Sequence, residues 1–108
     1  KAGAVALTDD GTTLTDEALF KLALSWAADL DLLVMDHAEL PSLSEGHLNE
    51  GKVSSLLGIA GRSRSAEAIA VARDGFLAQE TGAKIHIQHL SAKESVELIK
   101  LFKDKGVR

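Results

Sequence analysis

The sequence has 108 residues with 12 basic and 16 acidic side chains, which gives a net charge of −4. This length suits a single domain, and a charge balance without a dense basic stretch offers nothing to a nucleic-acid backbone. Because no apolar run approaches the roughly 20 residues of a membrane span and the N-terminus lacks a signal-peptide pattern, we expect a cytoplasmic protein without membrane contact.

The first predicted unit is a strand at residues 4–8 followed by a helix. Asp10-Gly11 is a turn signal after the strand, and helical spacing begins near Thr15. We expect the buried stripe of this helix to be the apolar residues that recur at helical spacing, Leu19, Leu22, Ala23, Trp26 and Leu30.

The second predicted unit has a strand at residues 32–35 and an alanine-rich helix at residues 66–79 that ends near Gly82. Gly75 inside this helix costs about 1 kcal/mol relative to alanine. The long stretch between strand and helix holds a short predicted helix at residues 53–57, and such long loops are usually functional or mobile. The evidence for the long helix is that apolar residues recur along it at helical spacing, namely Ile69, Ala72 and Phe76, and Ala70 and Leu77.

The third predicted unit is a strand at residues 85–90 and a helix that begins at Ser91 and ends before Gly106. Ser91 and Glu94 have the spacing of a capping box. The chain begins at Lys1 without a methionine and stops where a following strand would begin. We therefore interpret residues 1–108 as an internal segment of a larger α/β enzyme.

The order βα, βα, βα predicts parallel strands with all three helices on one face of the sheet. The other face carries Ala4, Ala6, Leu33, Met35, Ile85 and Ile87 if side chains alternate, and it must also be covered. A partial (β/α)8 barrel of three consecutive units satisfies this need and is favoured, whereas an open doubly wound sheet is the rival architecture.

The same alternation leads from the three strands to Asp10, His37 and His89. Side chains at the carboxyl ends of parallel barrel strands converge, and imidazole with carboxylate is a ligand set of catalytic zinc. Without cysteine, any metal must be held by such groups. The alternatives are that Asp10 is only a turn residue and that each histidine only caps a strand end.

Other polar residues receive weaker functional interpretations. Asp9 is expected to point away from the site, His86 to face the helices as a structural residue, and His47 to be solvated. Glu39 could orient a ligand. Residues 49–51 fit a substrate lid or a plain turn, and residues 62–65 fit a phosphate site or a solvated loop, with the plainer alternative favoured in both cases.

Several strings together resemble a known enzyme family. They are Gly3-Ala4-Val5-Ala6 with Asp9-Asp10-Gly11, Asp36-His37-Ala38-Glu39, Asn49-Glu50-Gly51, Val71-Ala72-Arg73-Asp74 and His86-Ile87-Gln88-His89-Leu90-Ser91. In this order and spacing the chain resembles the bacterial dihydroorotases of the amidohydrolase superfamily over nearly its whole length. The resemblance implies a metal-dependent (β/α)8 barrel in which this segment forms the fourth to sixth strand and helix units.

The resemblance also implies roles for single residues. Asp10 matches the carboxylate that replaces the carboxylated lysine of related enzymes as a metal bridge, and His37 and His89 match the histidine ligands of the fifth and sixth strands. One or two zinc ions and the reversible cyclisation of N-carbamoyl-L-aspartate to dihydroorotate are implied. Because the remaining ligands and the acid/base aspartate would lie outside the chain, we expect the segment alone to be inactive.

Two departures and two rival functions accompany the resemblance. Ala38 stands where a cysteine is common, and residues 62–65 lack the typical proline-containing turn.

A dihydropyrimidinase, hydantoinase or allantoinase shares the implied barrel but generally carries a lysine on the fourth strand, where this chain has Thr8-Asp9-Asp10. The other rival is a non-catalytic scaffold for a carbamoyltransferase. A homo-oligomer or a carbamoyltransferase complex is compatible with either function.

Overall fold

Three short strands form one parallel sheet in the order β1-β2-β5, with bounds Ala6–Thr8, Leu33–Asp36 and Lys84–Ile87. The computed structural model describes residues 3–108. Lys1, which the sequence analysis noted as a start without methionine, lies outside the described residues. In the register, Ala6 pairs with Leu33, which pairs on its other side with Lys84. The strands are adjacent, parallel and in sequence order, as predicted.

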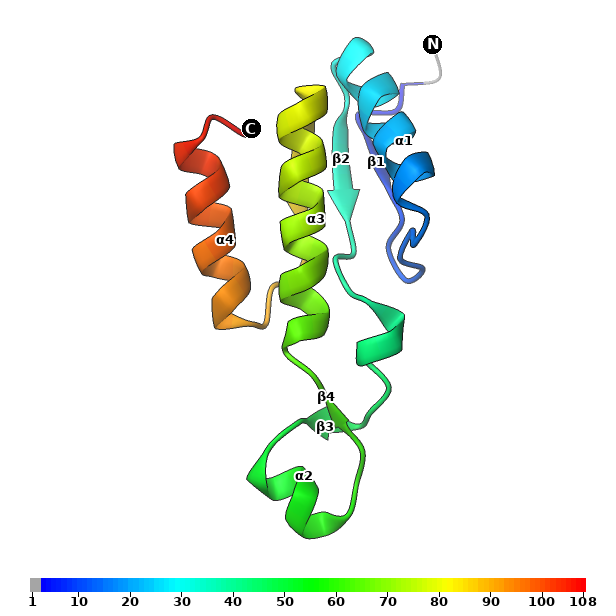
Figure 1. Cartoon of the computed structure of the whole chain (residues 1–108). Helices are drawn as coiled ribbons and strands as arrows, with labels where there is room; N and C mark the ends of the chain where they lie inside the picture. Colours follow the sequence, from blue (N-terminus) through cyan, green and yellow to red (C-terminus); the bar gives the residue numbers. More distant parts are fainter. Residues whose placement is uncertain (1–2) are drawn as a thin grey trace.

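Three helices follow the three strands and lie side by side over one face of the sheet (Figure 1). They are α1 (Glu17–Asp29), α3 (Ser65–Thr81) and α4 (Lys93–Asp104). Helix α3 packs between α1 and α4, and it also contacts β5. The predicted α/β class with helices on one face is confirmed. Among residues 3–108, no helix has the length and apolarity needed to cross a membrane.

Helix α1 buries a different stripe from the predicted one. Phe20, Leu24 and Ala27 form the core with Val34 and Ala83. The prediction was wrong because this helix has apolar residues on two faces, and spacing alone does not show which face meets the sheet. Four of the residues predicted to be buried are exposed by about half or more, namely Leu19, Leu22, Trp26 and Leu30.

Strand β5 presents the opposite faces from those predicted. Ile85 and Ile87 pack against the helix-side core, and Ile85 pairs in register with the buried Val34. His86 pairs with Met35 and is exposed on the face that carries no helix. The expectation that His86 faces the helices was therefore wrong, because a run of alternating Ile and His does not reveal which parity the register selects.

Close packing between α3 and α4 explains the glycine inside α3. A Cβ atom built on Gly75 would lie 2.2 Å from the ring of Phe102, which is itself buried. Gly82 ends α3 in the left-handed conformation with φ 72°, as predicted. Ile69 and Phe76, two residues of the helical repeat, are 49% and 59% exposed, and the Phe76 and Phe102 rings pack edge to face.

A carboxylate from α3, and not the predicted capping box, binds the segment that begins α4. Glu67 accepts hydrogen bonds from the backbone N–H groups of Ser91 and Ala92 at 2.8 and 2.9 Å, and from the Ser91 hydroxyl. Partial burial opposes the charged form of Glu67, but these hydrogen bonds hold the pKa of its carboxyl below the usual range. Ala92 is the N-cap, and no side chain caps it.

Residues 37–64, between β2 and α3, form a structured connection at the carboxyl end of β2, which we call the excursion (Figure 1). It contains a short 3-10 helix, a two-stranded parallel pair and the predicted short helix α2. Their bounds are η1 Pro41–Leu43, β3 Leu48–Asn49, α2 Lys52–Leu57 and β4 Gly61–Arg62. His47 is exposed, as expected.

Candidate metal centre

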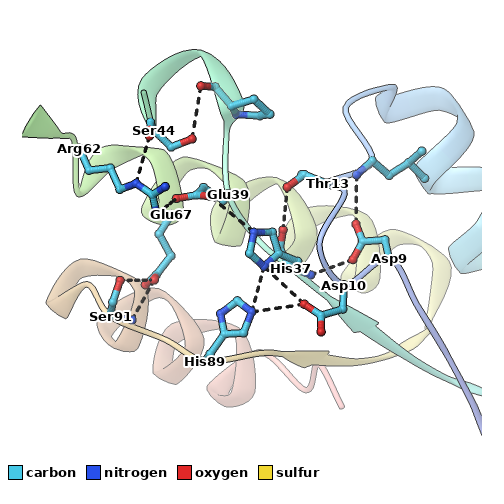
Figure 2. Close-up of polar contacts among 12 residues, drawn as sticks. Asp9, Asp10, Thr13, His37, Glu39, Ser44, Arg62, Glu67, His89 and Ser91 are labelled. Carbon is cyan, nitrogen blue, oxygen red and sulfur yellow. Dashed lines mark hydrogen bonds and ion pairs between the residues drawn. The ribbon is translucent and has the colours of Figure 1, made fainter. Parts of the chain in front are cut away.

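The loop after β1 is fastened to β2 by Asp9. One carboxylate oxygen of Asp9 accepts the N–H of His37 at 2.8 Å, and the other accepts the N–H of Leu14 at 3.0 Å. Asp9 thus binds backbone and leaves its neighbour Asp10 to face the site, as the strand alternation predicts (Figure 2). The sequence signal for Asp9 was only its adjacency to Asp10, so its role in holding this loop was not foreseen.

The two histidines reach the site from β2 and β5 by different routes. His37 directly follows β2 and continues its alternation, and its carbonyl accepts the Thr13 hydroxyl at 3.1 Å. His89 lies two residues beyond β5 and has φ 33°, in the left-handed region. This turn breaks the alternation of β5, so His89 points toward His37 although β5 has the opposite parity from the predicted one (Figure 2).

Asp10, His37 and His89 converge on one point. His37 Nδ1 and His89 Nε2 are 2.9 Å apart, and Asp10 Oδ1 lies 3.8 Å from the first and 3.7 Å from the second. One candidate ligand atom from each residue lies within 4.8 Å of the others. Two imidazole nitrogens and one carboxylate around a point form a donor set suited to a divalent transition-metal ion. The structure therefore brings together all three sequence-predicted residues.

A second layer of polar residues orients His37. Its Nε2 atom lies 3.5 Å from Glu39 Oε2, and Glu39 Oε1 lies 3.5 Å from an Nη1 atom of Arg62. The Arg62 Nε–H donates to the Ser44 carbonyl at 3.1 Å. Because Glu39 occupies the Nε2 side of the ring, the Nδ1 side is presented to Asp10 and His89. The excursion between β2 and α3 thereby supports a candidate ligand.

A cavity of about 880 Å³ opens beside two of the three candidate ligands, His37 and His89. The excursion supplies Asn49, Glu50 and Arg62 to its wall, while His37 and His89 lie at its edge. Residues 49–51 thus lie over a cavity at the strand ends, where a substrate could enter. Glu50 and Gly51 form a turn, which was the favoured interpretation, and the lid stays a prediction.

The residue before His37, Asp36, belongs to a buried cluster of ionisable side chains that the sequence analysis missed. Asp36 and Asp74 are fully buried, and Arg73 Nη2 lies 3.7 Å from Asp36 Oδ2 and 2.7 Å from Asp74 Oδ1. Burial, with Asp74 as the next cause, raises the pKa of Asp36 to about 9. The only signals in the sequence were an aspartate at the end of an apolar strand and the string Val71-Ala72-Arg73-Asp74.

Comparison with known proteins agrees with the geometry. The family model of dihydro-orotase-like proteins matches residues 1–95. The chain belongs to this dihydroorotase-like family. It is 50% identical over 108 residues to a dihydroorotase of Aquifex aeolicus and 47% identical over 109 residues to one of Carboxydothermus hydrogenoformans. All of the chain is covered in both comparisons, but it spans only 26% and 25% of the lengths of these relatives.

Solved structures similar to this dihydroorotase-like chain include a D-hydantoinase and a dihydropyrimidinase. A D-hydantoinase from Bacillus sp. AR9 has a TM-score of 0.71 and 26% identity, and it matches 97% of the chain with 25% of its own. A dihydropyrimidinase from Brevibacillus agri has a TM-score of 0.70 and 24% identity, and it matches 97% of the chain with 24% of its own. The second likeness shows the fold alone. Both support an α/β architecture with a parallel sheet.

Proposed function

We propose that residues 1–108 form the fourth to sixth strand and helix units of a dihydroorotase (β/α)8 barrel. In this proposal Asp10, His37 and His89 are ligands of one or two zinc ions. The observation that carries the proposal is the convergence of these three side chains after three adjacent parallel strands, within 4.8 Å of one another. Barrel enzymes place their active sites at this end of the sheet.

The residues present fit a zinc site. The set combines two neutral donors with one anionic donor, and Glu39 orients one imidazole while Asp9 holds the adjacent backbone. Zinc bound here would polarise a carbonyl group and lower the pKa of a bound water. The chain's own contribution is to hold the three candidate ligands next to a cavity, lined by His37 and His89, that is large enough for a small cyclic amide.

The proposed reaction is the reversible cyclisation of N-carbamoyl-L-aspartate to dihydroorotate, in the cytoplasm. It is supported by relatives named dihydroorotase that are 44–50% identical to the chain. A complete barrel would also cover the half-buried Leu33 and Met35 on the sheet face that carries no helix. The remaining metal ligands and the acid/base group would come from the rest of the barrel.

A hydantoinase or dihydropyrimidinase is the second candidate, and the structural likeness to a D-hydantoinase favours it. The end of β1 distinguishes the candidates, because this chain has Thr8-Asp9-Asp10 there and lacks the lysine that those enzymes generally carboxylate. A non-catalytic scaffold for a carbamoyltransferase is disfavoured because all three candidate ligands are present. A homo-oligomer or a complex with an active carbamoyltransferase is compatible with the proposed enzyme.

The test is an activity assay of the full-length protein that carries this segment, with dihydroorotate, hydantoin and dihydrouracil as substrates. We expect turnover of dihydroorotate that a chelator abolishes and zinc restores. The 108-residue chain alone should be inactive with added zinc. Preference for hydantoin or dihydrouracil would favour the second candidate, and chelator-sensitive turnover by the isolated chain would contradict the proposal.

A further inference from the structure

Arg73 extends from α3 to the loop that carries Asp10, where it contacts Leu14. Its side chain is only 10% exposed. One Nη1–H donates to the carbonyl of Leu14 at 2.8 Å, and the guanidinium lies 4.7 Å from the centre of the Phe20 ring. The contacts of Arg73 reach the candidate ligands only indirectly, through the loop at Leu14 and through Asp36, which precedes His37.

The backbone of Leu14 links Arg73 to a candidate ligand. Its carbonyl accepts from Arg73, its N–H donates to Asp9 at 3.0 Å, and the other oxygen of Asp9 accepts the N–H of His37 at 2.8 Å. Asp10 is covalently next to Asp9, so this hydrogen-bonded path touches the backbone beside two of the three candidate ligands. The third, His89, lies outside the path.

The guanidinium of Arg73 is itself held in place by two aspartates. Its Nε and Nη2 atoms lie 2.8 and 2.7 Å from one oxygen of Asp74, and Asp36 lies at 3.7 Å. A guanidinium carries five donors in a rigid planar fork, so it can bind Asp74 and Leu14 in fixed directions at once. A lysine ammonium would supply a similar charge at one point and could not reproduce both contacts.

We propose that Arg73 is a positioning residue that fixes the loop of residues 9–14 against the end of β2 and so sets the spacing of Asp10 and His37. The inference rests on the proposed metal site. An ion pair that served only to fill the core would need no bond to the site loop. The bond to the Leu14 carbonyl is the contact that connects Arg73 to the site loop, and metal binding separates a positioning role from a purely structural one.

The test is cobalt binding to the full-length protein, followed by visible absorption and by competition with a chelator. Arg73→Lys keeps the charge beside the two aspartates but loses the fork, and we expect its cobalt dissociation constant to rise about tenfold or more, with an altered spectrum. The matched control is Val71→Ala, a truncation in the buried core of the same helix that leaves the loop contacts intact. It should bind cobalt as the parent does.

Parent-like affinity and spectrum in Arg73→Lys would overturn the proposal, and so would an equal loss in Val71→Ala. Arg73→Gln should show at least the loss seen in Arg73→Lys; if it does not fold, Arg73→Lys decides. Because cobalt binding is measured without substrate, a parent that binds cobalt but does not turn over dihydroorotate would defeat the proposed reaction alone. A parent that binds no cobalt would defeat both proposals.

Discussion

At the scale of single residues, the charge balance behind the candidate centre depends on one proton. Asp36 and Asp74 are both fully buried and share a single guanidinium, that of Arg73. Two carboxylates with one cation would leave a buried negative charge, which is costly in a medium of low dielectric constant. Burial raises the pKa of both carboxyls, that of Asp36 to about 9, which favours the protonated, uncharged form of Asp36 at neutral pH.

This proton makes stability depend on pH. The pKa of Asp36 in the folded state, about 9, exceeds its ordinary value of 3.8. The stability that the protonated acid contributes is therefore fully present below the ordinary pKa and is lost as the pH rises toward 9. Asp36→Asn mimics the protonated acid and should flatten this decline. The measurement is the urea midpoint of the metal-free full-length protein between about pH 5 and pH 9.

Asp31→Asn is the matched control, because Asp31 is a surface acid that pairs with Lys84 and has a lowered pKa. Its loss should leave the decline above neutral pH intact. An equally steep decline in Asp36→Asn and in the parent protein would show that Asp36 does not hold the proton.

At the scale of elements, the contact of α3 with α4 depends on a missing side chain. Helix propensity alone predicts that Gly75→Ala would stabilise α3 by about 1 kcal/mol. The structure predicts the opposite sign, because the new methyl group would lie 2.2 Å from the buried Phe102 ring. The interhelical fit therefore outweighs the local preference of the backbone.

We expect Gly75→Ala to destabilise the full-length protein by roughly 1–3 kcal/mol, the usual cost of overpacking a core. Chemical denaturation measures this change. Phe102→Leu should recover part of the loss when it is combined with Gly75→Ala, since a smaller side chain leaves room for the methyl group. A more stable Gly75→Ala protein would show that the two helices can separate at little cost.

Local patterns in the sequence predicted the elements better than their contacts. Strand order, the short helix α2 and the stop at Gly82 follow from local signals and were confirmed. The buried face of α1, the parity of β5 and the Glu67 carboxylate beneath α4 depend on partners distant in sequence, and these were predicted wrongly or missed. His89 was reached only because its left-handed backbone compensates for the wrong parity.

At the scale of the whole molecule, the candidate metal ligands and the polar residues beside them lie at one end of the sheet. The three candidate ligands follow three adjacent strands, and the excursion between β2 and α3 supplies Glu39 and Arg62 beside them. Apolar side chains away from the site are left uncovered. Helix α1 exposes Leu22 and Trp26, and Leu33 and Met35 of β2 are only half-buried. These surfaces fit a segment that packs against the remaining units of a barrel.

The central claim, that this segment holds metal through Asp10, is tested most directly by metal content. In the full-length protein, Asp10→Asn should lower zinc content and turnover severely, because an amide cannot supply the anionic ligand. Asp9→Asn should lose less, since its remaining oxygen can still accept from His37 or Leu14. With both variants shown to be folded, zinc content in Asp10→Asn equal to that of the parent, or a loss confined to Asp9→Asn, would contradict the account.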